Sequence, residues 1–175
     1  MLETHSSEEK IGKTKIVYKN HYKVKGDVNK VLEYLKSTKV PDVEGFDKSR
    51  FIGNEILNDK SFRRVIRSKL PPVDSVAKHL ITFEYVDIQY ELAHDDGIIT
   101  SICRNPLQLQ GKFNFTEEVV ICQDEEDNEY FTFERKAIVS NKAAKLPFLG
   151  SAFNHFNDYY NNQSIQTYLK MFSEC

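Results

Sequence analysis

The chain has 175 residues, enough for one domain with a substantial core. Hydrophobic residues make up 40% and charged residues 29%, and the net charge of -2 argues against nucleic acid as a partner. No apolar run approaches the roughly 20 residues of a membrane span. The three scattered cysteines are typical of reduced thiols. Residues 1–15 lack an apolar segment and are predicted to be a disordered lead, which precedes a single domain of residues 16–175.

The first half of the chain predicts one helix and several strands. Alternation from Ile16 to Val24 predicts a strand. Asp27 is a typical N-cap, and the apolar residues after it recur at helical spacing over 28–35. Residues 50–59 and 61–70 predict two strands, and prolines open a short predicted helix over 71–80.

The second half predicts strands over 85–92, 98–104, 107–123 and 129–139, and then a helix over about 147–172. Short turns between consecutive strands indicate antiparallel pairing. The expected fold is therefore α+β, with a curved antiparallel sheet of about seven strands wrapped on the long C-terminal helix. In this helix-grip arrangement, sheet and helix enclose a cavity.

One carboxylate interrupts the apolar face of the strand 107–123. Apolar residues occupy its odd positions, but Glu117 stands among them. A turn centred near Glu126 places Glu117 opposite Arg135, and opposite charges across an antiparallel pair are favourable. Two interpretations remain open: the pair is neutralised inside, or at the mouth of, a cavity, or it lies near a sheet edge and reaches water.

Known enzyme and metal-site motifs are absent from the sequence. It contains no nucleophile elbow, zinc-protease motif, P-loop or dinucleotide motif. The five histidines lie on different predicted elements, and His94-Asp95-Asp96 precedes Gly97 at a predicted turn. We therefore expect no catalytic site, no metal and no cofactor.

A basic cluster occupies the strand 61–70. Alternation places Arg63 and Arg67 on one face and Arg64 on the other, with Phe62 and Ile66. The cluster is either a solvated strand face or a contact for anionic lipid headgroups at a membrane surface.

With its elements in this order, the chain resembles the PRELI/MSF1 family of intermembrane-space lipid transfer proteins, within the START-like superfamily, over residues 16–172. The resemblance is carried by "SKLPPVDSVAKHL", by "SICRNPLQLQGKFNFTEEVVI" with Asn105 and Glu117, and by "FLGSAFNHFNDYYNNQSIQTYLKMF". It implies a phospholipid headgroup faced by basic residues, for which Arg64, Lys78 and Arg135 are candidates. It also implies a small twin Cys-x9-Cys partner protein and a mitochondrial intermembrane-space location; without it, the sequence predicts a cytoplasmic protein.

Two functions remain open at this point. The first is a lipid-binding protein that transfers phospholipid between membranes, with Glu117 and Arg135 near the headgroup. The second is a START-like protein-interaction or adaptor module with a filled core, for which an apolar void of several hundred Å³ would be contrary evidence. In the lipid-binding function, acyl chains would contact an aromatic wall made of Phe113, Phe115, Phe131, Phe133, Phe153, Phe156 and Tyr160.

Overall fold

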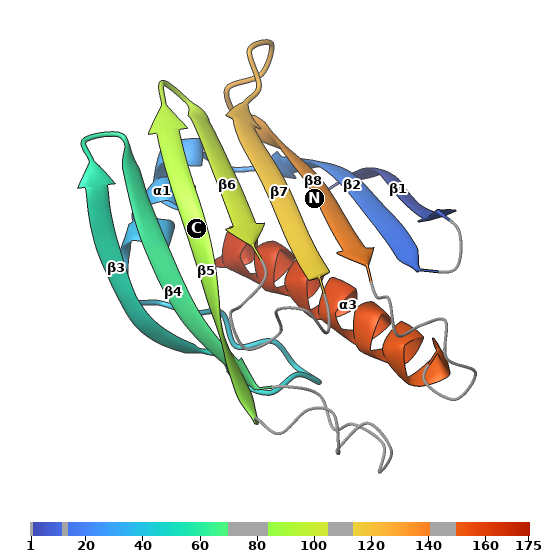
Figure 1. Ribbon diagram of the computed structural model, residues 1–175. Helices are drawn as coiled ribbons and strands as arrows, with labels where there is room; N and C mark the ends of the chain where they lie inside the picture. Colours follow the sequence, from blue (N-terminus) through green and yellow to red (C-terminus); the bar gives the residue numbers. More distant parts are fainter. Residues whose placement is uncertain (1, 12–13, 70–83, 105–113, 141–149) are drawn as a thin grey trace.

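The computed structural model describes residues 2–11, 14–69, 84–104, 114–140 and 150–175, with side chains described from residue 5 onward and, in the last helix, from residue 157 onward. This part of the chain is an α+β structure with one antiparallel sheet of eight strands and a long C-terminal helix (Figure 1). The strands are β1 (Leu2–Ile11), β2 (Lys15–Lys25), β3 (Arg50–Asn58), β4 (Ser61–Lys69), β5 (Tyr85–Asp95), β6 (Ile98–Arg104), β7 (Asn114–Gln123) and β8 (Tyr130–Ser140). The helices are α1 (Val28–Lys36) and α3 (Gly150–Glu174).

The strands lie in the order β1-β2-β8-β7-β6-β5-β4-β3. Every neighbouring pair is antiparallel. Strand β2 pairs with β8, although α1 and the strands β3 to β7 lie between them in the sequence. The two edge strands, β1 and β3, therefore belong to the two hairpins at opposite ends of the sheet. Figure 1 shows α3 running across one face of the sheet.

Helix α1 forms where the sequence predicts it. The Asp27 side chain accepts a hydrogen bond from the Asn29 N–H at 2.7 Å, which caps the helix. Val28, Val31 and Leu35 are buried on one side of the helix, and α1 packs beside β6, β7 and α3. Helix α1 thus lies beside the C-terminal end of α3, where the Tyr34 hydroxyl donates to the Glu174 carboxylate at 2.8 Å.

The turn between β5 and β6 also follows from the sequence. Asp96 has a φ of 25° and Gly97 a φ of 76°. Two consecutive positive φ values are what a tight hairpin turn requires, and Asp-Gly is a favoured pair for it. The acidic residues before Gly97 therefore serve the turn, and no group of potential metal ligands occurs among the residues that the structure describes.

Buried apolar side chains on the inner face form two clusters. One contains Phe131 and Phe133 of β8 with Met171 and Phe172 of α3 and the buried side of α1. The other contains Tyr18, Phe115, Ala137 and Tyr160 with parts of β5 and β6. Strands β2, β7 and β8 contribute to both clusters. On each of them, a buried polar residue separates the two clusters, namely Asn20, Glu117 and Arg135.

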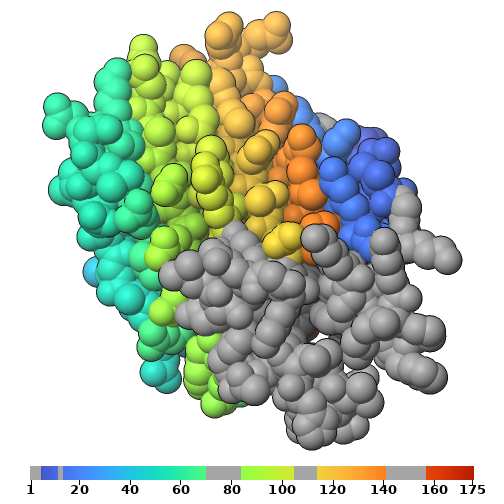
Figure 2. Space-filling view, in the orientation of Figure 1, coloured from blue at the N-terminus to red at the C-terminus, as the bar shows by residue number. Residues whose placement is uncertain are grey.

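Figure 2 shows the molecule from the outer face of the sheet, the face turned away from α3. Cross-strand ion pairs lie on this solvated face. Arg63 contacts Glu55 at 2.8 Å and Glu91 at 3.4 Å, and Arg67 contacts Asp87 at 2.7 Å. This arrangement confirms the predicted separation of Arg63 and Arg67 from Arg64. For these two arginines it supports the solvated-face interpretation, because each already has a carboxylate partner.

Three predictions need correction or fall outside the described residues. Residues 2–11 form strand β1, not a disordered lead, because the edge of β2 offers them backbone partners along the strand, with one irregularity between Glu3 and His5. This extra strand explains why the sheet has eight strands and not about seven. The predicted helix over 71–80 and the first part of the predicted strand 107–123 lie outside the described residues.

Candidate functional site

A row of polar side chains crosses the inner face of the sheet between the two apolar clusters. Backbone pairing places Glu117 beside Cys103, Cys103 beside Tyr90, and Tyr90 beside Arg64. On the other side of Glu117, Arg135 of β8 is paired with Asn20 of β2. We call this set the polar row; its members are Asn20, Arg135, Glu117, Cys103, Tyr90 and Arg64.

Glu117 and Arg135 form a buried ion pair at the centre of the polar row. Arg135 Nε donates to Glu117 Oε2 at 2.6 Å, and the side chains are 0% and 2% exposed, Arg135 first. Arg135 Nη1 also donates to the side-chain oxygens of Asn20, at 3.0 Å, and Asn161, at 2.7 Å. Arg135 Nη2 is buried and has no hydrogen-bond partner among the described residues. The interpretation of the pair as a neutralised interior pair is confirmed.

The register of this pair differs from the prediction. Arg135 lies opposite Val119 in the ladder, and Glu117 lies opposite Ala137. The contact is therefore diagonal. The turn is centred on Asp127 and not on Glu126, because the Tyr130 N–H donates to the Asp127 carbonyl at 2.9 Å. A shift of the turn by one residue moves the facing residue by two, so both side chains stay on the inner face.

Helix α3 binds directly to the ion pair. Ser164 Oγ donates to Glu117 Oε2 at 2.6 Å, and Tyr168 OH donates to Glu117 Oε1 at 3.3 Å. Together with Asn161, these residues recur at spacings of three and four and thus share one face of the helix. Each carboxylate oxygen of Glu117 therefore has a donor, and the polar row is part of the contact between sheet and helix.

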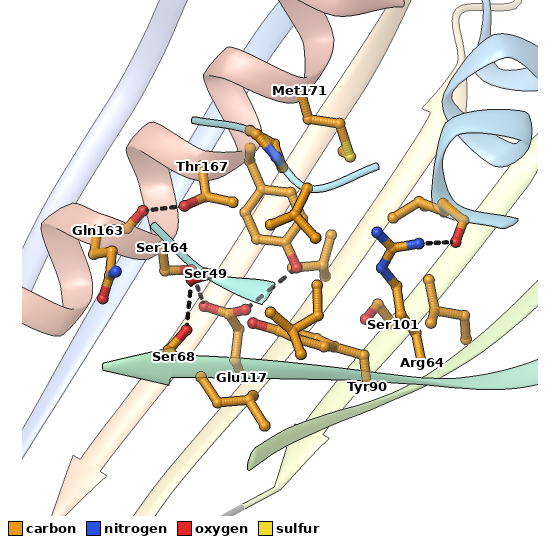
Figure 3. A pocket seen from close by; sticks show the side chains of 18 of the residues that line it. Ser49, Arg64, Ser68, Tyr90, Ser101, Glu117, Gln163, Ser164, Thr167 and Met171 are labelled. Carbon is orange, nitrogen blue, oxygen red and sulfur yellow. Dashed lines mark hydrogen bonds between the residues drawn. The ribbon is translucent and has the colours of Figure 1, made fainter. Parts of the chain in front are cut away.

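A cavity of about 90 Å³ lies between the inner face of the sheet and α3 (Figure 3). Most of its wall is apolar, from residues such as Ile88, Leu92 and Met171. Polar side chains reach it at a few points, among them Glu117 and Arg64. A mostly apolar cavity with a few polar groups is typical of small-molecule sites. The remaining polar wall residues include Ser49, Ser68, Tyr90, Ser101, Gln163, Ser164, Thr167 and Tyr168.

Arg64 occupies the end of the cavity next to α1. Its guanidinium donates to the backbone carbonyls of Leu35, Ser37 and Lys39, with a distance of 2.7 Å to Ser37. The residue is 3% exposed, and burial lowers the pKa of the guanidinium. Arg64 therefore satisfies carbonyls at the C-terminal end of α1. The prediction that Arg64 contacts a membrane surface is wrong, because the side chain is inside the protein.

The predicted aromatic wall is only partly present among the described residues. Phe115 and Tyr160 line the cavity, with ring centroids 6.5 Å apart. Phe133 is fully buried but packs against Tyr168 and Phe172, with centroids 5.0 and 5.2 Å away. It belongs to the packed core and does not form part of the described cavity wall. Phe113 and Lys78, and the side chains of Phe153 and Phe156, lie outside the described part of the chain.

The ionisable groups around Glu117 are held in their neutral forms by burial. Burial raises the pKa of the Tyr168 phenol well above its usual value, and the Glu117 carboxylate raises it further. Burial also raises the pKa of the Tyr90 phenol and of the Cys103 thiol, again with a contribution from Glu117. The site therefore holds one ion pair among neutral hydrogen-bonding groups.

A second hollow lies on the other side of α3, against β1 and β2. It has a volume of about 560 Å³ and is open to solvent. Its wall is mainly polar; Tyr18 OH donates to Asp158 Oδ1 at 3.0 Å, and Asn20 Nδ2 donates to Ser6 Oγ at 3.1 Å. Asn20 and Asn161 separate this hollow from Arg135.

Sequence reasoning found the ion pair but missed the residues around it. Asn20 and Tyr90 occupy inward positions of strands that were predicted correctly, so the strand period already marked them as buried polar residues. Ser164 and Tyr168 were recognisable only by their spacing from Asn161 on one helical face. Ser101 also occupies an inward position of a predicted strand, but a serine within a strand is common and did not single it out as a site residue.

No family model and no curated protein matches this chain. Among solved structures, a conserved protein from Geobacillus kaustophilus matches over 90% of this chain and 93% of its own, with 13% sequence identity and a TM-score of 0.46. A protein from Deinococcus radiodurans matches over 69% of this chain and 81% of its own, with 12% identity and a TM-score of 0.31. Neither similarity assigns a family or a function. Within the described residues, no helix has the length and apolarity needed to cross a membrane.

Proposed function

We propose that this protein is a START-like lipid-binding protein that carries a lipid between membranes in the space between its sheet and α3. Support for a START-like, helix-grip fold comes from the order of the described elements after β1, which are a strand, a helix, six further strands and a long C-terminal helix, with β2 beside β8 in the sheet. The single observation that carries the binding proposal is the mostly apolar cavity between the sheet and this helix.

The size of the cavity limits what it can hold in this state. A volume of about 90 Å³ corresponds to roughly three water molecules in the liquid and is below the ~300 Å³ at which typical ligand pockets begin. The end of one acyl chain would fit, but two complete chains would not. Lipid loading therefore requires that the space between α3 and the sheet widens. Each buried CH₂ then contributes about 0.8 kcal/mol to binding.

The small volume favours a second candidate function, an interaction module that binds other proteins and no lipid. In that case the residual cavity is a packing defect. The acidic β7–β8 turn, where Asp124 contacts Lys23 at 2.5 Å, would then be one docking surface. The resemblance to PRELI/MSF1 proteins alone would imply a phospholipid ligand, a mitochondrial intermembrane-space location and a twin Cys-x9-Cys partner. Each of these needs its own test.

Native mass spectrometry after incubation with mixed phospholipid vesicles distinguishes the two functions. A one-to-one adduct with a lipid mass supports the carrier. The matched variants are Ser101→Leu, which fills the cavity from β6, and Thr100→Leu, which adds the same side chain at the neighbouring exposed position. We expect the adduct with wild type and Thr100→Leu and not with Ser101→Leu, provided that circular dichroism shows both variants folded. A bare protein mass for the wild type would favour the interaction module.

A further inference from the structure

The two charged side chains on the cavity wall are already fully engaged. Glu117 accepts hydrogen bonds from Arg135, Ser164 and Tyr168. Arg64 donates to three backbone carbonyls at the end of α1. A ligand ion in the cavity would have to break one of these sets, and breaking a buried charge pair leaves an uncompensated charge. Among the described residues, the wall therefore offers no free counter-ion.

On the described part of the cavity wall, the polar groups that lack partners are uncharged; the buried Arg135 Nη2 also lacks a partner, but Arg135 is not one of the wall residues. No hydrogen bond to the described residues is formed by the Tyr90 hydroxyl, the Ser101 hydroxyl or the Gln163 side-chain amide, and all three residues line the cavity. Ser101 is 6% and Gln163 7% exposed. Figure 3 shows Tyr90 and Ser101 on the sheet side and Gln163 on α3. Buried polar groups in folded proteins normally have partners, and a polar group of a ligand in the cavity would supply them to these three.

The positions of the three groups suit one small polar group with an attached chain. Tyr90 is paired with Cys103, so Ser101 is its diagonal neighbour on the adjacent strand. Gln163 approaches from the opposite wall and supplies both a donor and an acceptor. On β5, Ile88 and Leu92 lie two residues before and after Tyr90 and add apolar surface to the cavity wall. A hydroxyl or ester group in this place would be bonded while its hydrocarbon stays in contact with apolar side chains.

This inference rests on the lipid-binding function proposed above. We infer that the ligand is an uncharged lipid bearing a hydroxyl or ester group, of the monoacylglycerol or diacylglycerol class, and not an anionic phospholipid. Tyr90, Ser101 and Gln163 bind its polar group, and the remaining wall excludes a phosphate because burial of an uncompensated anion is costly.

The test is competition within one membrane. The purified full chain is incubated with vesicles containing monoacylglycerol, diacylglycerol, phosphatidylcholine, phosphatidic acid and phosphatidylserine with identical acyl chains, and the recovered protein is analysed by native mass spectrometry. We expect a one-to-one adduct with the mass of monoacylglycerol or diacylglycerol. Tyr90→Phe and Ser101→Ala should each weaken binding of that lipid roughly three- to tenfold, the range expected for one lost hydrogen bond.

The matched control is Tyr85→Phe, which removes the same hydroxyl from an exposed position of the same strand and should leave affinity unchanged. An adduct with phosphatidylcholine, phosphatidic acid or phosphatidylserine would overturn the inference and leave the lipid-carrier function standing. Binding of the uncharged lipid that is unaffected by both cavity variants would also overturn it. Absence of every lipid adduct would remove the carrier function itself.

Discussion

Arg135 contacts Glu117 diagonally across the β7–β8 ladder: its backbone partner is Val119, yet its Nε lies 2.6 Å from Glu117 Oε2. A long side chain spans one diagonal step of an antiparallel pair. The contact binds two strands to each other and, through Ser164, to helix α3. The buried pair therefore connects three elements, β7, β8 and α3. Because it is buried, its loss should lower the free energy of unfolding.

Removal of one partner of this pair should strongly destabilise the protein. We expect Glu117→Ala to lower the free energy of unfolding by about 3–5 kcal/mol, because it leaves the Arg135 guanidinium buried without its carboxylate. The double variant Glu117→Leu with Arg135→Met should recover much of this loss, since two apolar side chains remove the desolvation cost. Urea denaturation measures both effects.

The control for the buried pair is the exposed pair on the outer face. Arg67 and Asp87 are 2.7 Å apart, with side chains 47% and 28% exposed. Asp87→Ala should cost below about 1 kcal/mol. Equal losses at Glu117 and Asp87 would contradict the assignment of a structural role to the buried pair.

Replacement of Arg64 should disturb the end of α1. Arg64→Met removes the hydrogen bonds to three backbone carbonyls and should lower the free energy of unfolding by about 3 kcal/mol. Arg64→Lys should rescue little, because one ammonium cannot replace a planar guanidinium that contacts several acceptors. Arg63→Met, one position away on the exposed face, should cost below about 1 kcal/mol. If Arg64→Met matched this control in thermal unfolding, its capping role would be refuted.

Stability should fall at alkaline pH. Burial raises the pKa of Tyr90 and Tyr168 well above the usual value of 10.0. In the window above pH 10 the folded state keeps these protons and the unfolded state loses them. The contribution of the two phenols is thus fully present below pH 10 and is lost as pH rises above it. Urea titrations across this window measure the slope, which should be shallower in Tyr90→Phe; an identical slope in that variant would count against the buried-phenol explanation.

Strand β1 should protect the edge of the sheet. Deletion of residues 2–11 would expose the backbone N–H and C=O groups of β2 that now pair with β1. We expect the truncated protein to self-associate in size-exclusion chromatography and to unfold at a lower urea concentration. Glu9→Ser, which changes an exposed side chain and keeps the strand, is the control. A truncated chain that stays monomeric with unchanged stability would show that β1 is dispensable.

The sequence predicted most of the described sheet because its strands alternate strictly between two faces. Tyr90 and Leu92 on β5, for example, point inward as the period of two requires. Even the misplaced turn did not affect the faces of Glu117 and Arg135, since the error moved the ladder by an even number of residues. Long-range pairing within the predicted pattern was therefore recoverable.

Features that depend on contacts between distant elements were not recoverable in this way. Residues 2–11 contain no alternating apolar pattern, and they form a strand because β2 supplies backbone partners. The role of Arg64 depends on where α1 ends in space, which strand patterning does not encode. The alternation of the strand showed that Arg64 points inward. It could not show that three backbone carbonyls at the end of α1 accept hydrogen bonds from it.

The hydrogen bonds from Asn161, Ser164 and Tyr168 also determine how α3 is aligned. Rotation of the helix by one residue, about 100°, would bring Ile165 and Leu169 towards the ion pair and leave the Glu117 carboxylate without its helix donors. Apolar packing alone distinguishes such alternative seatings poorly, because it is non-directional. The ion pair thus favours one rotation of α3 about its axis. By holding the helix in that rotation, it also determines the shape of the cavity between α3 and the sheet.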